Sequence, residues 1–108
     1  MSKYGNVKVT FDGVVFDSKK ERDRYIDLRI LERAGEIENL ELQPEYELIP
    51  KSKTERAVKY RGDFRYTENG HTVVEDVKST ATAKDKAYII KRKLMRWRYP
   101  RVEFREVK

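Results

Sequence analysis

The sequence predicts an α/β protein in which a central, mostly antiparallel mixed sheet has a helix on each side. Two segments, residues 17–37 and 79–100, carry apolar side chains at helical spacing. The alternating runs typical of strands lie at residues 40–50, 57–66, 72–78 and 101–107. The predicted order is therefore an N-terminal β-hairpin, then helix, three strands, helix and strand.

The composition indicates one small domain. The 108 residues are enough for a single domain over residues 1–108 with a modest core, and 41% of them are charged. Cysteine is absent, which excludes a disulfide framework and a thiolate zinc site. No apolar run approaches the length of a signal peptide or a membrane span, so we expect a cytoplasmic protein without a membrane partner.

The basic charge is concentrated in the C-terminal part of the chain. Residues 79–108 hold ten lysines and arginines and three acids, a formal charge of +7. The whole chain carries +6, so the first 78 residues carry −1. This distribution predicts an anionic partner for the C-terminal part.

The first 37 residues contain a hairpin and a helix. Residues 7–16 alternate and break at Asp12-Gly13, which predicts a short hairpin with a type I′ turn. The helix that follows has Asp17 or Ser18 as its N-cap and Gly35 just past its last turn. Its predicted buried stripe, with Ile30 beside it, is Tyr25, Leu28, Leu31 and Ala34.

Glu21 has two possible roles. It lies four residues before Tyr25, so the buried stripe extended backwards places an acid at the end of the face that packs on the sheet. The pattern from Ser18 to Glu21 also matches a capping box, with Phe16 able to staple the start of the helix. The local pattern alone favours the cap, but the two roles do not exclude each other.

The turn at Asn69-Gly70 predicts the register of the hairpin formed by residues 57–66 and 72–78. Those two residues suit a two-residue type I′ turn. The numbers of every opposed pair then add up to 139, as 69 and 70 do, which places Asp63 directly opposite Asp76. Like charges directly opposed at about 4.5–5.5 Å are destabilising, so a cation between the carboxylates is expected.

Lys78 extends this charged group. It is two residues beyond Asp76 and shares its face, while Val77 points away and offers its backbone carbonyl. The alternative is a charge ladder on the surface that uses the basic residues on the face of Asp63, namely Arg61 and Arg65; such ladders contribute little stability. The apolar surroundings of the hairpin favour a functional site.

Three carboxylates at one place predict a divalent cation. Glu21, Asp63 and Asp76 could hold Mg²⁺ in an oxygen shell completed by water, the Val77 carbonyl and a substrate phosphate. Such an ion lowers the pKa of a bound water, and Lys78 could orient that water or stabilise developing charge. The predicted chemistry is hydrolysis of a phosphodiester.

The last helix is predicted as one segment capped near Ser79 to Thr82 and ended by Pro100. Its predicted core face is Ala83, Ala87, Ile90, Leu94 and Trp97. The basic residues predicted to contact DNA phosphates are Lys84, Lys91, Arg92, Lys93, Arg96 and Arg98. Tyr88 and Tyr99 stay undecided between packing and base stacking, and His71 is expected in an exposed loop.

The motif "GDF…VVEDVKS", which begins at Gly62, resembles the Asp…(Asp/Glu)-x-Lys signature of the PD-(D/E)XK nuclease superfamily. The segment from Ser18 to Leu48 is similar to the helix and first strand of small phage-encoded members. The layout is also similar to transposon end-cutting endonucleases and archaeal Holliday-junction resolvases. The resemblance covers nearly the whole chain and implies a restriction-endonuclease-like core.

The resemblance assigns roles by position. Glu21 corresponds to the helix acid, Asp63 to the first strand acid, Asp76 to the second and Lys78 to the motif lysine. Gln43 matches a glutamine that lies near the site in such members.

Two positions depart from the pattern or compete within it. Gly62 stands where the motif name has proline. Glu75 adjoins Asp76 but lacks a lysine two residues later, because position 77 is valine, so Asp76 is the better match.

The resemblance implies a Mg²⁺-dependent endodeoxyribonuclease in which Mn²⁺ can substitute. We expect a phage-related homodimer in the cytoplasm of a bacterial host that recognises branched DNA, such as a four-way junction, through its phosphates. The alternatives are a non-catalytic basic DNA-binding module and a nuclease subunit that takes its specificity from a partner protein.

Overall fold

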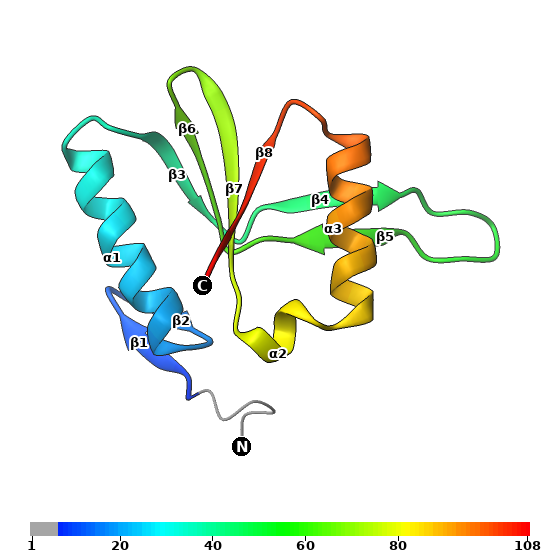
Figure 1. Cartoon of the computed structure of the whole chain (residues 1–108), viewed down its shortest axis with the longest axis horizontal. Coiled ribbons are helices and arrows are strands. Elements are labelled where there is room, and N and C mark those ends of the chain that lie inside the picture. The colour runs from blue at the N-terminus through cyan, green and yellow to red at the C-terminus, as the bar shows by residue number, and fades with distance from the viewer. Residues whose placement is uncertain (1–6) are drawn as a thin grey trace.

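The computed structural model describes residues 7–108. The first six residues, which the predicted domain includes, lie outside the described residues. The helices and strands (Figure 1) are β1 Val9–Phe11, β2 Val14–Phe16, α1 Lys19–Arg33, β3 Glu38–Leu42, β4 Glu45–Ile49, β5 Val58–Arg61, β6 Phe64–Glu68, β7 His71–Val77, α2 Thr80–Ala83, α3 Lys86–Arg98 and β8 Glu103–Val107.

The main sheet is mixed, as predicted. Its strand order is β3-β6-β7-β8; β7 and β8 are parallel and the other two pairs are antiparallel. The parallel pair follows from the long connection through α2 and α3. The prediction of an α/β protein with a mostly antiparallel mixed sheet is confirmed.

The two long helices cover opposite faces of this sheet. Val73 and Val74 are neighbours in β7, and strand alternation sends them into two different cores. Val73 packs with Tyr25 and Leu28 of α1, and Val74 packs on the α3 side. The sheet therefore has one small core on each face.

The strands predicted at residues 40–50 and 57–66 are each broken in two. The pairs Leu42↔Phe64 and Glu45↔Arg61 keep the same register, with numbers adding to 106, so β3-β6 and β4-β5 belong to one antiparallel ribbon. Gln43 at the break has a φ of 51°, in the left-handed region, and is followed by Pro44. The ribbon bends there, and β4-β5 leaves the main sheet to run across it beneath α3 (Figure 1).

Gly62 lies at the bend on the other strand, where β7 comes close. A Cβ built at this glycine would lie 2.8 Å from Val74 Cγ1, a distance too short for packed atoms. Gly62 stands where the motif name has proline. Its lack of a side chain lets the backbone of the bend come close to the buried Val74.

Gly62→Ala should destabilise the protein by about 1–3 kcal/mol, because the added methyl group overpacks a buried contact. Chemical denaturation measures this loss. Combining it with Val74→Ala removes the colliding methyl, so the double variant should lose less than the sum of the two single losses. Additive losses would show that the collision with Val74 is not the cause of the loss in Gly62→Ala.

The two predicted type I′ turns are both present. Asp12 and Gly13 have φ values of 54° and 75°, and Asn69 and Gly70 have 50° and 80°. The β6-β7 register follows the predicted sum of 139 from Glu68↔His71 to Phe64↔Glu75. His71 begins β7 and pairs with Glu103, so the expectation of a loop residue is wrong.

α1 follows its sequence signals closely. Ser18 is the N-cap, and Tyr25 and Leu28 are buried, as predicted. Leu31 is partly buried against the same core. Ala34 is exposed because the helix ends before it, at Arg33.

The predicted helix at residues 79–100 is two helices. Asp85 interrupts it, and its side chain accepts a hydrogen bond from the Ala87 amide as the N-cap of α3. The restart changes which residues face the sheet: Tyr88 and Met95 are buried, while Ala87 is exposed.

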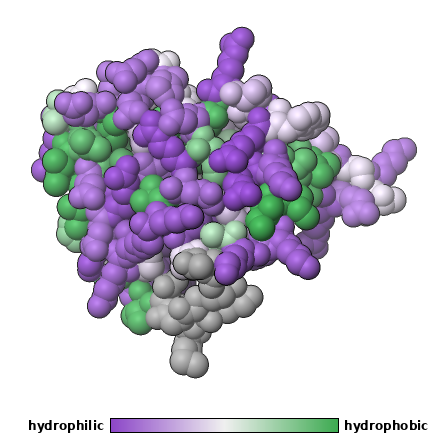
Figure 2. Space-filling model, viewed as in Figure 1, coloured by the Kyte–Doolittle hydropathy of each residue, from purple (hydrophilic) through white to green (hydrophobic). Residues whose placement is uncertain are grey.

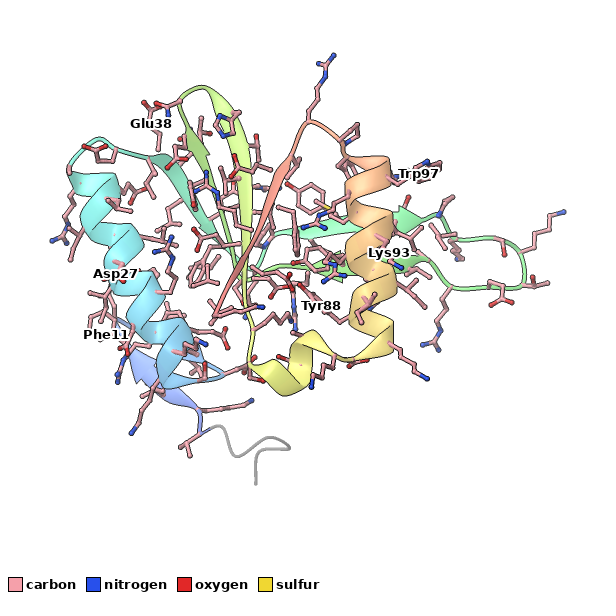
Figure 3. All side chains as sticks on the ribbon, in the orientation of Figure 1. Phe11, Asp27, Glu38, Tyr88, Lys93 and Trp97 are labelled. Carbon is pink, nitrogen blue, oxygen red and sulfur yellow. The ribbon has the colours of Figure 1, made fainter. Side chains whose placement is uncertain are left out.

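The predicted core face of the last helix is therefore largely wrong. Ile90 is 58% exposed and Trp97 is 77% exposed, and both belong to the outer side of α3. Ala83 and Leu94 are partly buried, and Leu94 packs at the margin of the core. Figure 3 shows Tyr88 between α3 and the strands and Trp97 pointing away from them.

Within residues 7–108, no helix has both the length and the apolar character that crossing a membrane requires.

Candidate functional site

The predicted acids and lysine meet where α1 begins and β7 ends. Glu21 comes from the first turn of α1, Asp63 from the bend before β6, Asp76 from the end of β7 and Lys78 from just beyond it. Beside them is a cleft of about 220 Å³, lined by Asp17, Ser18, Lys20, Glu21, Asp63, Val77, Lys78, Ser79 and Thr82. Residues separated by more than fifty positions in the chain thus share one small volume.

Asp63 adopts a different arrangement from the predicted regular pair. The β6-β7 ladder ends at Phe64↔Glu75, one residue short of Asp63↔Asp76. The Asp63 amide donates to the Glu75 carbonyl at 3.0 Å, and its Oδ2 accepts the Val77 amide proton at 2.7 Å. The carboxylate therefore takes the place of a backbone acceptor and lies beside Asp76 without a regular cross-strand pair.

Asp76 is buried beneath the cleft, with 2% of its surface exposed. Its Oδ2 accepts a hydrogen bond from the Tyr60 hydroxyl, and its Oδ1 lies 3.3 Å from Lys78 Nζ. Arg65, the partner that a surface ladder would use, binds Glu41 and Tyr46 instead. A buried aspartate with this arrangement is not part of an exposed charge ladder.

Glu21 takes part in both the N-terminal cap of α1 and the candidate site. Ser18 Oγ accepts the Glu21 amide proton at 3.1 Å, which is the N-cap half of the capping box. The Glu21 carboxylate receives the Ser18 hydroxyl at 3.5 Å and lies within hydrogen-bonding reach of Asp63. The helix start is therefore capped by Ser18 while the acid faces the aspartates.

Burial raises the pKa of all three acids. Burial, then the negative charge of Asp63, raises the pKa of Asp76 to about 7, in spite of Lys78 and Tyr60. Burial, then the charge of Glu21, raises the pKa of Asp63 to about 6. Burial also raises the pKa of Glu21; a hydrogen bond with Asp63 opposes this increase, and the negative charges of Asp17 and Asp76 add to it. Raised carboxylate pKa values in a cleft are typical of functional sites.

The donor set suits a hard cation such as Mg²⁺, although it is not arranged as a finished metal site. Among the residues the structure describes, no three acidic or histidine side chains are in a geometry ready to hold an ion. Neutral donors occupy Oδ2 of both aspartates, from the Val77 amide and the Tyr60 hydroxyl. A cation would use oxygen ligands, and carboxylates whose charges repel each other are the ligands it would stabilise.

Without divalent cations, stability should fall as the pH rises from about 4 to about 8. The pKa values of Asp63 and Asp76 are raised in the folded protein, so the folded state binds more protons than the unfolded state across this range. The loss should be on the order of 2–4 kcal/mol. Thermal unfolding in EDTA at several pH values measures it.

Asp63→Asn tests the origin of that slope. The amide keeps an oxygen for the Val77 amide proton but removes one charge, so the variant should be more stable than the wild type at pH 8 and should show a flatter pH dependence. Adding Mg²⁺ or Mn²⁺ at pH 8 should raise the melting temperature of the wild type. An unchanged slope in Asp63→Asn would contradict charge repulsion as the cause.

Gln43 lies next to the same acids, as the resemblance implies. It lines a second cavity of about 160 Å³ together with Glu21 and Asp63. Its left-handed backbone, which is uncommon for a residue other than glycine, sets the bend of the ribbon at this place. The side chain is thus positioned by the same feature that breaks the strand.

Two tyrosines belong to the site in roles that the sequence did not predict; Tyr88, left undecided above between packing and base stacking, is buried. Tyr60 donates to Asp76, and the Tyr88 ring lies under Lys78, with Nζ 4.3 Å from the ring centre. The Tyr88 hydroxyl donates to Glu106 at 2.6 Å, which fixes the ring. Tyr60 comes from β5 and Tyr88 from α3. Sequence periodicity does not predict how these two elements pack beside the end of β7.

Glu75 has a separate role on the other face of β7. It is completely buried and accepts two hydrogen bonds from Arg24, at 2.7 and 2.6 Å, and one from the Tyr66 hydroxyl. The carboxylate is thus fully engaged by Arg24 and Tyr66, which supports the choice of Asp76 over Glu75 as the site residue.

The predicted basic face of the last helix is divided. Arg92 faces Glu106 and the Tyr88 ring, Arg96 stacks over Phe104, and Arg98 donates to the Leu48 carbonyl at 3.4 Å. The lysines of the predicted set are placed differently: Lys84 and Lys93 are exposed and Lys91 is half-buried.

Together the fold and the site define a mixed α/β protein with a partly buried carboxylate cluster and a lysine where the central strand β7 ends. The chain belongs to the family described as "Protein of unknown function (DUF1064)", which matches residues 1–108. No curated protein and no solved structure matches it.

Proposed function

We propose that this protein is a metal-dependent DNA endonuclease with a restriction-endonuclease-like core. The observation that carries the proposal is that Glu21, Asp63 and Lys78 line one cleft, with the buried Asp76 beside Lys78 and Asp63. The core order of helix, strands, helix and parallel last strand agrees with that class. The domain matches no known structure, so the proposal depends on the chemistry of the site.

The bound metal would be Mg²⁺, with Mn²⁺ able to substitute, held by the three carboxylates and the Val77 carbonyl. When bound, it would polarise the scissile phosphate and make a water molecule nucleophilic at neutral pH. Lys78 lines the cleft with its ammonium over the Tyr88 ring, and the ammonium could donate to that water or to a phosphate oxygen. Tyr60 orients Asp76 from below.

The proposed substrate is branched DNA recognised by shape. The charge of the C-terminal thirty residues suits phosphate contacts, and no separate base-reading domain is present in residues 7–108. One site of this size cuts one strand, so paired cuts in a four-way junction would need a homodimer. We place the protein in the cytoplasm of a bacterial host, as a phage-related enzyme.

The test is a cleavage assay with purified protein on four-way junction, flap, single-stranded and plasmid DNA, in Mg²⁺, Mn²⁺ or EDTA. Cutting with either metal and none in EDTA is expected, with the junction cut fastest. If the protein binds DNA but cuts none of these substrates, it is a non-catalytic binding module. If it cuts only after a partner protein is added, it is a nuclease subunit.

A further inference from the structure

The ribbon formed by β4, β5 and the loop at residues 50–57 projects from the body of the protein, and we call it the arm. In Figure 1 it runs beneath α3 and continues beyond it, so that the loop lies at the far edge of the molecule. Figure 2 shows this end standing clear of the surrounding surface. Residues 50–56 are all exposed.

The arm is held firmly at its base. Leu48 and Tyr60 are buried in the core on the α3 side. The Tyr99 hydroxyl donates to the Glu47 carbonyl at 2.7 Å, and its ring packs on Tyr46 with centres 4.9 Å apart. Because Tyr60 also donates to Asp76, the arm is connected directly to the candidate site.

The tip is ordered by one serine. Ser52 Oγ accepts the amide protons of Thr54 at 3.3 Å and Glu55 at 3.0 Å, and the Ser52 amide donates to the Glu55 carbonyl at 3.0 Å. The loop is therefore a defined turn, and the lysines on either side of Ser52 are held outward with little conformational freedom in the backbone.

The basic residues of the arm are concentrated in its loop and in β5. Residues 51–61 contain five basic residues and one acid, Glu55, a formal charge of +4, while Glu45 and Glu47 of β4 bring the whole arm, residues 45–61, to +2; the basic residues are Lys51, Lys53, Arg56, Lys59 and Arg61. Among the ion pairs of residues 7–108, these five contribute one, between Lys59 and Glu45 at 3.3 Å. The three basic residues of the tip, Lys51, Lys53 and Arg56, make no ion pair within residues 7–108. Their charges are therefore free to bind an anionic partner.

We propose that the arm docks in the major groove of duplex DNA beside the cleavage site. A two-stranded ribbon is of the width that the major groove, about 12 Å wide, admits. The seven-residue path from Asp63 to Arg56 spans at most about 23 Å, which corresponds to at most roughly seven base pairs at 3.4 Å each. The distance to the cut rests on the proposed function; the DNA contact itself does not.

The experiment compares two triple variants that remove the same charge. Lys51→Ala/Lys53→Ala/Arg56→Ala changes the tip, and Lys8→Ala/Arg33→Ala/Lys108→Ala removes three exposed cations elsewhere. Fluorescence anisotropy in EDTA measures binding to a labelled duplex of about 30 base pairs over a range of salt concentrations. The tip variant should bind at least about tenfold more weakly, with a salt slope lower by about 2–3, while the control changes little.

Three results would overturn the proposal: equal weakening in both variants, equal loss on single-stranded DNA, or stronger binding and a larger loss on an RNA duplex, whose deep and narrow major groove should not admit the arm. Melting temperatures confirm that each variant is folded.

Because metal is absent, the outcome of the binding experiment is independent of cleavage. If the wild type cuts and the tip variant binds normally, only the arm proposal fails. If the wild type never cuts and the tip variant binds weakly, only the nuclease proposal fails.

Discussion

For the proposed nuclease, Asp76→Asn should lower DNA cleavage by about a thousandfold or more, because it removes one of the charged carboxylates that would hold a metal worth several kcal/mol to the reaction. Asparagine has the same shape, and its oxygen can still accept the Tyr60 hydroxyl. The loss should therefore appear in the rate of the chemical step and leave DNA binding in EDTA close to that of the wild type.

The same change should stabilise the metal-free protein at pH 8. The pKa of Asp76 is raised to about 7 by burial and by Asp63, so the wild type bears the cost of an ionised, buried carboxylate at that pH. Asp76→Asn removes this cost. The variant should have a higher melting temperature in EDTA and should gain less stability from Mg²⁺ than the wild type does.

Asp27→Asn is the matched control. Asp27 is an exposed acid of α1, away from the cleft, and the change removes one charge of the same type. Cleavage and metal-dependent stability should both stay near the wild-type values. If Asp76→Asn cuts as well as this control, Asp76 is not part of a catalytic centre.

Arg24→Met should destabilise the protein by about 3–5 kcal/mol, because it leaves the buried Glu75 carboxylate without its partner. Arg24 binds both oxygens of Glu75, which has no exposed surface. Denaturant unfolding at neutral pH measures the loss. Methionine keeps most of the length of the side chain, so lost charge accounts for most of the effect.

Two further variants separate charge from packing. Arg22→Met removes the nearby Arg22–Asp23 pair, whose Asp23 side chain is 64% exposed, and should cost less than about 1 kcal/mol. Adding Glu75→Gln to Arg24→Met should restore part of the stability, because the buried group is then neutral and can still accept from Tyr66. Equal losses in Arg22→Met and Arg24→Met would refute the account.

Much of the fold could be read from local patterns. Turn chemistry at Asp12-Gly13 and Asn69-Gly70 predicted both hairpins, since those φ values favour the residues present. The apolar spacing around Tyr25 and Leu28 predicted the buried side of α1. These features depend on neighbours in the sequence, and so periodicity is enough to find them.

The last helix shows where local patterns fail. Asp85 caps a new helix, and a single break rotates every later residue about the axis, so that Trp97 is exposed and Met95 is buried. Similarly, Gln43 and Gly62 bend a ribbon that alternation alone predicts to be straight. Contacts across the sheet decided both outcomes.

For this protein, the sequence by itself determined which residues gather at the site: Glu21, Asp63, Asp76 and Lys78 are specified by a hairpin register and a helix period. The tertiary structure alone decided how they are held. The bend at Gly62 gives Asp63 to the Val77 amide, and burial under α3 brings Tyr60 to Asp76 and Tyr88 to Lys78. Register and period are local, whereas burial and the pKa values it raises depend on segments that meet only when the chain is folded.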